Sequence, residues 1–232
     1  MGCVLDGVNE FSIRKGEFAA LLRGVRSYVV SDVGGRPLLY ASRPANEFFA
    51  VTVFVGVGIL FNLLAHFLPM NDQGLLPFIM PLLLVSVMFY SFRKSKITVA
   101  TRIDGTDATF SLAPEDSFLM LRNRYVVIDQ SGMRIGSVAL VSNLKHLSGV
   151  WQVKDAGGRQ ILVAKSVLFA FRNTIYDLMD GQEKTALGKV DTTFFEGRYS
   201  VSLSDGPNCD VDRRLVAGLA LLMFDYTKRK RR

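Results

Sequence analysis

Hydrophobic and polar side chains alternate along most of the chain from residue 96 to residue 204. The stretches YVVIDQSGMRIGSVAL (125–140) and WQVKDAGGRQILVAKS (151–166) carry β-branched and aromatic residues at every second position on either side of a short polar segment. A period of two is typical of strands with one buried face. Counting both arms of each turn predicts roughly ten to twelve short strands, which must close or form a sandwich to avoid open edges.

The polar segments between the strands share one frame, in which an aspartate precedes a glycine by three residues. It occurs at Asp32–Gly35, Asp129–Gly132 and Asp155–Gly158, and a weaker copy with a displaced glycine follows Tyr176. Aspartate and glycine are favoured at the first and fourth positions of a type I turn. The frame therefore predicts hairpins. These carboxylates could instead be catalytic, but turn chemistry accounts for all of them.

Two long apolar runs interrupt this pattern. Residues 48–68 and 75–92 contain no Asp, Glu, Lys or Arg, and the connection between them is short. At 1.5 Å rise per residue, each run is long enough for a helix that crosses a bilayer core of about 30 Å. We therefore expect a two-helix transmembrane hairpin within residues 46–95. A pair of very hydrophobic core helices in a soluble protein is the alternative.

The flanking charges predict an orientation for this hairpin. Arg36 and Arg43 precede the first run, whereas Arg93, Lys94 and Lys96 follow the second, and the loop between the runs has no Lys or Arg. The positive-inside rule then places both ends in the cytoplasm. The expected protein is a two-pass integral membrane protein, with both termini and the β-domain cytoplasmic.

A different element closes the chain. The segment DVDRRLVAGLALLMFDY (210–226) has an uncharged stretch from Leu215 to Phe224, which is too short to span a bilayer. A helix that is apolar on all sides is buried within protein. The sequence thus predicts a mainly β fold, a closed antiparallel barrel around a buried C-terminal helix, with the barrel formed by residues 20–45 and 96–227.

The order of these features resembles the Tubby-like β-barrel superfamily, in particular its LURP-one-related and phospholipid scramblase-like branch. The resemblance rests on YVVIDQSGMRIGSV, then WQVKDAGGRQILVAKS, then the closing Asp-x-Asp-Arg-Arg-Leu and apolar helix. It implies a barrel of about twelve strands that interacts with lipid. The apolar insert departs from the family pattern, as does the lack of the cysteine-rich and proline-rich segments of scramblases.

The same resemblance implies a calcium site before the last helix, where scramblase-like proteins carry an acidic segment. The matching residues here are Asp205, Asn208, Asp210 and Asp212. Alternating oxygen-bearing residues suit a hard cation, but the glycine and terminal glutamate of an EF-hand are missing. Asp210 or Asp212 could instead cap the helix. No other cofactor is expected.

The net charge of +7 comes largely from the last five residues, Lys228, Arg229, Lys230, Arg231 and Arg232. The remainder is only mildly basic, so the charge does not require a nucleic-acid partner. Near an anionic leaflet each positive charge of the tail would contribute about 1 kcal/mol, which makes these residues candidates for lipid binding. A solvated terminus is the alternative.

Little material for catalysis is visible. Cys3 and Cys209 lie far apart without metal-ligand spacing, and His66 and His146 are the only histidines. The expected function is therefore a non-enzymatic, membrane-anchored protein that interacts with membrane lipids, among them anionic ones, or serves as a scaffold. The alternative is a phospholipid scramblase, which would need an oligomer because two helices form no polar groove. Acylation of Gly2 and Cys3 stays open, since Asp6 departs from the myristoylation motif.

Overall fold

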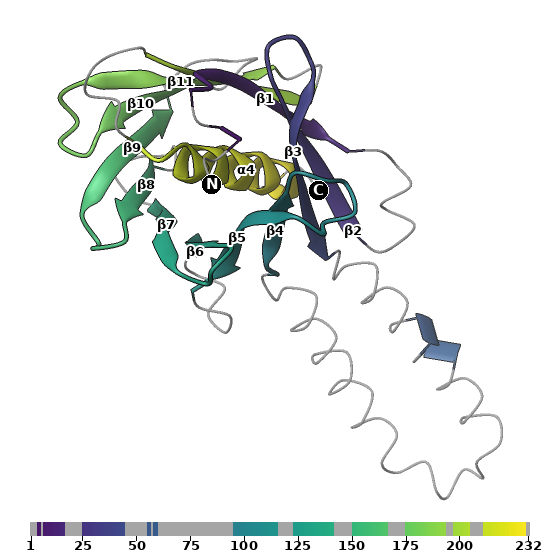
Figure 1. Ribbon diagram of the computed structural model, residues 1–232. Coiled ribbons are helices and arrows are strands. Elements are labelled where there is room, and N and C mark those ends of the chain that lie inside the picture. The colour runs from purple at the N-terminus through teal and green to yellow at the C-terminus, as the bar shows by residue number, and fades with distance from the viewer. Residues whose placement is uncertain are drawn as a thin grey trace, which may run out of the picture.

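The computed structural model describes residues 4–5, 7–16, 25–44, 55–56, 58–59, 95–115, 123–141, 150–166, 175–193, 197–204 and 211–230. Within these residues the chain forms a closed barrel of twelve strands, with one long helix running through its centre (Figure 1). The mainly β barrel around a C-terminal helix that the sequence predicts is confirmed.

All neighbouring strands pair antiparallel in chain order, and β1 closes the barrel by pairing with β12 as well as with β2. The strands are β1 (Glu10–Lys15), β2 (Val25–Ser31), β3 (Pro37–Pro44), β4 (Ile97–Ala100), β5 (Ala108–Pro114), β6 (Asn123–Asp129), β7 (Arg134–Val141), β8 (Val150–Asp155), β9 (Gln160–Ser166), β10 (Ile175–Asp180), β11 (Ala186–Thr193) and β12 (Arg198–Leu203). The barrel includes β1, which lies ahead of residue 20, where the predicted domain begins.

The period-two pattern sets the register. Val138 of β7 pairs with Val153 of β8, which pairs in turn with Leu162 of β9, and all three are fully buried. A shift of one residue would turn each of these side chains to the opposite face of its strand. The alternation in the sequence therefore specifies which residues line the barrel interior.

The interior is filled by α4 (Arg213–Lys230), in which every residue from Leu215 to Asp225 is buried. Asp212 caps the helix: its main-chain carbonyl accepts from Leu215 N, and its Oδ1 accepts from Arg214 N. Strand β7 lies close to the helix at Gly136, where an added Cβ would lie 2.9 Å from Leu215 Cδ2 and 2.3 Å from the carbonyl oxygen of Lys154. The absence of a side chain at this position thus permits the packing of helix on strand.

Three hairpin turns have the Asp-x-x-Gly geometry that the sequence predicts. In each turn the glycine N–H donates to the aspartate carbonyl, and the aspartate Oδ1 accepts from the main-chain N–H four residues further on. The glycines Gly35, Gly132 and Gly158 have φ values of 81°, 85° and 85°, in the left-handed region that favours glycine. The aspartates are therefore engaged in turn structure.

The pKa of Asp129, in the turn between β6 and β7, depends on a hydrogen bond from Ser131. Ser131 Oγ donates to Asp129 Oδ1 over 2.7 Å and, together with the N–H of Met133, holds the pKa of Asp129 below its ordinary value of 3.8. A carboxyl with a lowered pKa stabilises the fold fully above its unfolded pKa, and the contribution is lost as the pH falls through the folded value. We expect Ser131→Ala to raise the pKa of Asp129 toward 3.8 in an NMR titration of the side-chain carboxyl carbon.

The fold offers an internal control for this titration. Hydrogen bonds from Thr106 lower the pKa of Asp104 in another turn, and the exchange at residue 131 should leave that pKa unchanged. An unaltered pKa of Asp129 in Ser131→Ala would contradict the assignment of the shift to the serine hydroxyl.

The fourth, weaker copy of the frame also forms a turn, with a different residue in the left-handed conformation. Glu183, at φ 61°, stands where the other turns have glycine, and its carboxylate pairs with Lys165. A left-handed conformation costs a residue with a Cβ about 1–2 kcal/mol. Glycine avoids this cost but loses more conformational entropy on folding, so its net advantage at this position is smaller. We expect Glu183→Gly to be more stable than Glu183→Gln by about 0.5–1 kcal/mol in urea denaturation.

Glu183→Gln is the matched control, because it removes the ion pair and keeps a side chain at the strained position. The exposed pair itself contributes little, about 0.2–1 kcal/mol. Equal stability of the two variants would show that the backbone conformation at this position carries no cost.

The expected two-helix transmembrane hairpin needs correction. Among the described residues α4 is the helix that reaches 18 residues, and none of the helices there is long and apolar enough to cross a bilayer. The two-helix part of the predicted fold and the two-pass integral membrane localisation are therefore wrong by this finding.

Both predictions rested on the length and lack of charge of residues 48–68 and 75–92. These properties permit a membrane helix but do not by themselves specify one. Apart from 55–56 and 58–59, these runs lie outside the described residues.

Residues 45–94, which include the apolar runs, stand between β3 and β4 in the order of the strands.

Candidate site at the tail end of the barrel

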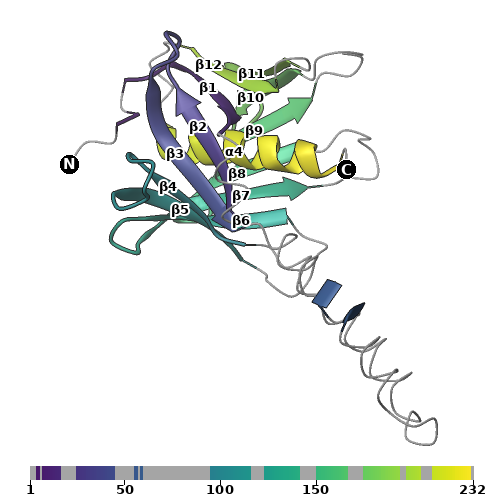
Figure 2. The same cartoon turned by 90° about the vertical axis from the view of Figure 1, so that its right-hand side faces the viewer.

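The two ends of the barrel differ in their connections. At one end, called here the turn end, lie the tight hairpin turns and the start of α4 (Figure 2). At the opposite end, called the tail end, lie the last residues of α4 together with the ends of β1 and β3 and the starts of β2 and β4. Residues 45–94 are connected to the barrel at the tail end, between Pro44 and Ser95.

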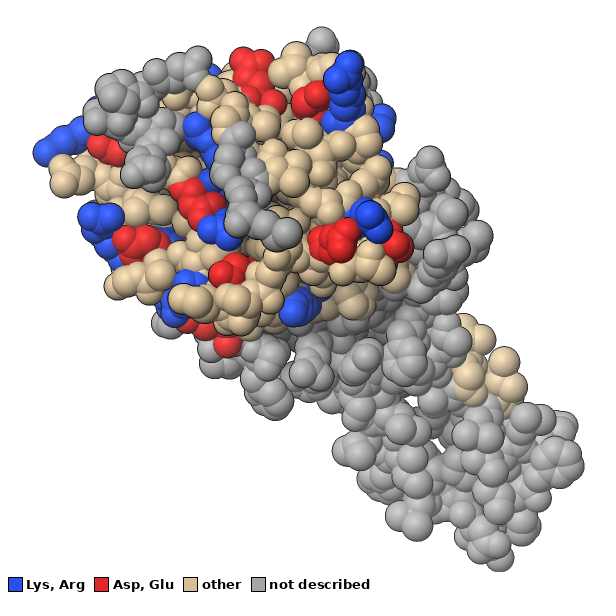
Figure 3. Space-filling model, in the orientation of Figure 1, with Lys and Arg blue, Asp and Glu red and all other residues tan. Residues whose placement is uncertain are grey.

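Charge is distributed unequally between these two ends. Within the last two residues of each described strand at the tail end, every charged residue is Lys or Arg. They are Arg14, Lys15, Arg26, Arg43, Arg124, Lys165 and Arg198. Four of them face acids outside these positions: Arg26 and Arg43 face Asp225, Arg124 pairs with Glu115, and Lys165 pairs with Glu183. The corresponding positions at the turn end carry acids and bases together, namely Glu10, Asp129, Asp155 and Asp180 with Arg134 and Lys154. In Figure 3, which looks at the turn end, red and blue side chains are interspersed.

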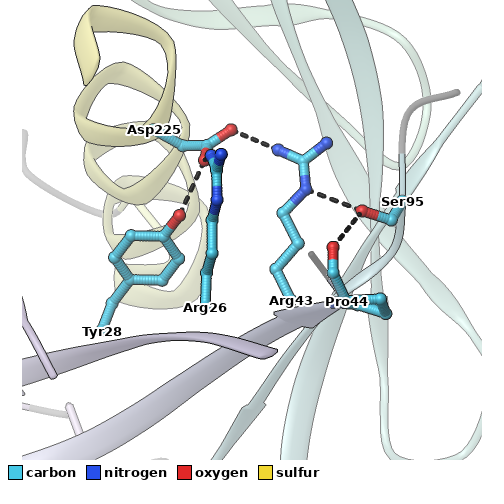
Figure 4. Close-up of polar contacts among 6 residues, drawn as sticks. All are labelled: Arg26, Tyr28, Arg43, Pro44, Ser95 and Asp225. Atoms are coloured by element: carbon cyan, nitrogen blue, oxygen red, sulfur yellow. Dashed lines mark hydrogen bonds and ion pairs between the residues drawn. The ribbon is translucent and has the colours of Figure 1, made fainter. Parts of the chain in front are cut away.

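A cluster of buried charged groups lies just inside the tail end, between α4 and strands β2 and β3 (Figure 4). Asp225 accepts a hydrogen bond of 2.7 Å from Tyr28 Oη and is paired with Arg43 Nη1. Arg26 Nη1 lies 3.6 Å from the other carboxylate oxygen, the one that accepts from Tyr28. The carboxylate on the helix thus contacts side chains from two adjacent strands and fixes the rotation of α4 within the barrel.

The same arginine joins the two points where residues 45–94 leave and re-enter the barrel. Arg43 Nε donates to Ser95 Oγ over 2.8 Å, and Ser95 Oγ donates to the carbonyl of Pro44 over 3.2 Å. Because Arg43 also pairs with Asp225, both attachment points are connected to the end of α4.

Burial makes this cluster energetically important. The side chains of Arg43 and Asp225 are 1% and 5% exposed, whereas that of Arg26 is 13% exposed. Burial, followed by the nearby carboxylate of Asp225, raises the pKa of Tyr28 well above its ordinary value, so its hydroxyl remains a donor at neutral pH. Among the described residues the buried Arg43 Nη2 finds no hydrogen-bond partner, and an unmet buried donor costs about 1–3 kcal/mol.

Aromatic rings pack below the cluster. The ring of Phe224 meets Tyr28 and Tyr199 edge to face, with centroid separations of 5.7 and 4.9 Å. Trp151 packs edge to face against Tyr226 at 5.8 Å and is 2% exposed. The tryptophan therefore belongs to the packed interior of the barrel.

The predicted lipid-binding tail begins at this end. Lys228, Arg229 and Lys230 form the last turn of α4 and continue from the buried cluster, while Arg231 and Arg232 lie outside the described residues. The backbone thus directs the start of the basic tail to the same end as the basic strand termini. Its contact with lipid stays a prediction.

The predicted calcium residues are only partly described. Asp205, Asn208 and Asp210 lie outside the described residues, and Asp212 caps α4 at the turn end, where its carboxylate also pairs with Arg214 over 2.6 Å. The capping alternative therefore holds for Asp212. No group of three His, Cys, Asp or Glu side chains suited to a metal is found among the described residues. Calcium binding by the other three stays a prediction.

The buried cluster was not predicted from the sequence. The sequence does contain an indication of it. Arg26 and Arg43 occupy inward-facing positions of their strands, two residues from Tyr28 and Ala41, which are both buried. A charge at an inward position of a strand is costly unless it is paired, so such a position indicates a partner inside the barrel. Asp225, which directly follows the apolar stretch of the last helix, is that partner.

Comparison with known proteins adds little to this geometry. No protein-family model matches the chain, and no curated protein matches it. A search of solved structures finds similarity to a protein from Arabidopsis thaliana known from an X-ray structure, with 12% identity, a TM-score of 0.27, and coverage of 57% of this chain and 85% of that chain. Similarity at this level carries no argument about function.

Proposed function

We propose that this protein is a non-enzymatic lipid-interaction protein, whose tail end contacts the surface of membranes that contain anionic lipid. The observation that carries the proposal is the charge distribution of the barrel, since the described strand termini at the tail end bear only Lys and Arg among their charged residues. The basic last turn of α4 lies at the same end. A one-sided distribution of this kind orients a protein toward an anionic surface.

The size of the expected attraction follows from general electrostatics. A Lys or Arg close to an anionic leaflet contributes about 1 kcal/mol, and the attraction falls off over a Debye length of about 10 Å at moderate salt. Arg14, Lys15 and Lys96 are exposed at the tail end and can approach a flat surface together. Exposed cations at the turn end lie on the opposite side of the barrel and would remain farther from the same surface.

The proposed family is the Tubby-like superfamily. Its support is the closed twelve-strand barrel around a buried C-terminal helix, the arrangement that the resemblance in sequence implies. No observation favours the alternative of phospholipid transport. Residues Leu215–Asp225 of α4 are buried in the centre of the barrel, so the barrel interior is occupied by protein.

Vesicle flotation of the full chain tests the proposed function. We expect the wild-type protein to float with phosphatidylcholine vesicles that contain phosphatidylserine more than with phosphatidylcholine alone, and the difference to shrink at high salt. Replacing Arg14, Lys15 and Lys96 by Gln should weaken the binding that depends on phosphatidylserine by roughly 100-fold, since three charges of about 1 kcal/mol each are lost.

A matched control uses three exposed cations at the turn end. Arg36→Gln, Arg134→Gln and Arg159→Gln together change the net charge by the same amount, and we expect this variant to bind nearly as the wild type does. Equal weakening by the two triple variants would mean that net charge, and not the tail end, governs binding. Equal flotation with and without phosphatidylserine would contradict the proposal.

A further inference from the structure

The hydroxyl group of Ser95 lies where residues 45–94 rejoin the barrel. Ser95 directly follows this segment and stands two residues before β4, and its side chain is half-buried. Its Oγ accepts from Arg43 Nε over 2.8 Å and donates to the carbonyl of Pro44 over 3.2 Å. The hydroxyl group thus contacts a buried guanidinium at a position that is not fully closed to solvent.

The guanidinium of Arg43 presents a pair of donors to Ser95, of which the hydroxyl group uses one. Nη1 pairs with Asp225 and Nε donates to Ser95, and Figure 4 shows the third nitrogen, Nη2, on the side of the guanidinium that faces Ser95. Among the described residues Nη2 finds no acceptor, although the Arg43 side chain is only 1% exposed. Two parallel donors of this kind match the oxygens of a phosphoryl group, which can accept from both at once.

The sequence around Ser95 is basic. Arg93 and Lys94, which lie outside the described residues, precede the serine, and the exposed Lys96 follows it. Protein kinases of the basic-directed class select serines by pairing acidic groups of their own with Lys and Arg next to the serine. The basic flanks and the pair of donors on Arg43 are separate observations, and both point to the same modification of the same atom.

We infer that Ser95 is a phosphorylation site, and that Nε and Nη2 of Arg43 hold its phosphoryl group. The γ-phosphoryl group of ATP is transferred: a bond forms between Ser95 Oγ and phosphorus, the bond from phosphorus to the ADP oxygen breaks, and the hydroxyl proton is released. Arg43 keeps its pairing with Asp225, because that pairing uses Nη1. Since the ester oxygen carries no proton, the hydrogen bond from Ser95 to Pro44 is lost.

Treatment of the full chain with ATP and the catalytic domain of protein kinase C, a basic-directed serine kinase, tests the acceptor. We expect peptide mass spectrometry to find phosphate on Ser95. Ser95→Ala should lack it, and Arg93→Gln combined with Lys94→Gln should lower the rate at Ser95 at least about tenfold, since two charges that the kinase recognises are lost. Absence of phosphate from Ser95 in the wild type would overturn the inference.

A consequence for membrane contact rests on the proposed function. A phosphoryl group adds about two negative charges to the tail end, so we expect the phosphorylated protein to bind phosphatidylserine vesicles at least about tenfold more weakly. Ser95→Ala treated with the same kinase is the control and should float as the untreated wild type does. Equal flotation of the two forms would count against the membrane contact of the tail end, whereas the next measurement involves no lipid.

The role of Arg43 is tested by 31P NMR titration of the phosphorylated protein. Phosphoserine has an ordinary second pKa of about 6, and an arginine that binds the dianion lowers it. We expect a pKa of about 5 in the protein, from one charge-assisted bond of about 1.5–3 kcal/mol. The phosphorylated peptide of residues 90–100 is the matched control, because it has the same basic flanks and lacks Arg43. Equal pKa values in protein and peptide would overturn the assignment to Arg43, and this comparison requires no variant of that buried residue.

Discussion

Asp225→Ala should lower the free energy of unfolding by about 3–5 kcal/mol, the range measured when one partner of a buried ion pair is removed. The cause is the guanidinium that remains. Arg43 is 1% exposed and has no other carboxylate among its described contacts, so the variant would keep an uncompensated charge inside the barrel. The hydroxyl of Tyr28 would lose its acceptor as well. Urea denaturation followed by circular dichroism measures the change.

Two comparisons separate this explanation from a general effect of losing a carboxylate. Asp107→Ala removes an ion pair with Arg102 whose side chains are 53% and 71% exposed, and such a pair contributes only about 0–1 kcal/mol. The double variant Asp225→Leu with Arg43→Met removes both buried charges, and we expect it to regain more than half of the stability lost in Asp225→Ala. If the double variant is no more stable than the single one, the unpaired charge is not the source of the loss.

The cluster also gives the barrel a connection between distant parts of the chain. Asp225 lies within the last six residues of α4, and Arg43 and Ser95 flank residues 45–94. A disturbance at the attachment points of that segment would therefore act on the end of the helix from which the basic tail continues. Arg43 thus links the two residues that flank this segment, Pro44 and Ser95, to Asp225 near the end of α4.

Much of the barrel could be predicted from local patterns. Alternation of apolar and polar residues specifies which side chains face inward, as at Val138 and Val153, and the Asp-x-x-Gly frame specifies the hairpins. The buried helix follows from an apolar stretch that is too short for a bilayer. Each of these signals lies within one segment of about fifteen residues, where sequence spacing and spatial contact coincide.

The parts that escaped prediction depend on contacts between distant residues. Asp225 and Tyr28 are 197 positions apart, and no spacing in the sequence indicates that they meet. Strand β1 lies ahead of the predicted domain, and its part in the barrel depends on its pairing with β12, which is far away in the sequence. The prediction of a transmembrane hairpin depends on the hydropathy and length of two segments. Both quantities describe a segment by itself and carry no information about its contacts with the rest of the fold.

The second large effect is expected in the aromatic packing of the barrel interior. Phe224→Ala should lower the free energy of unfolding by about 3–5 kcal/mol, through lost burial and the cavity that remains. The ring is 1% exposed and lies edge to face with Tyr28 and Tyr199. These tyrosines belong to β2 and β12, the two strands that pair with β1, so both strands pack against Phe224. Urea denaturation measures the loss, and 1H–15N NMR spectra show whether the barrel retains its fold.

Phe224→Leu is the matched control, because it keeps most of the apolar volume and loses the two edge-to-face contacts. Such ring pairs contribute about 0.5–1.5 kcal/mol each beyond the burial of apolar area. We therefore expect Phe224→Leu to lower the free energy of unfolding less than Phe224→Ala does, but more than a volume-conserving exchange by itself would. Because Phe224 directly precedes Asp225, a cavity here should also loosen the hydrogen bond between Tyr28 and the carboxylate. If Phe224→Ala loses less than about 1 kcal/mol, α4 is not packed in the barrel as described, since a buried phenylalanine in a close-packed core cannot be removed at so small a cost.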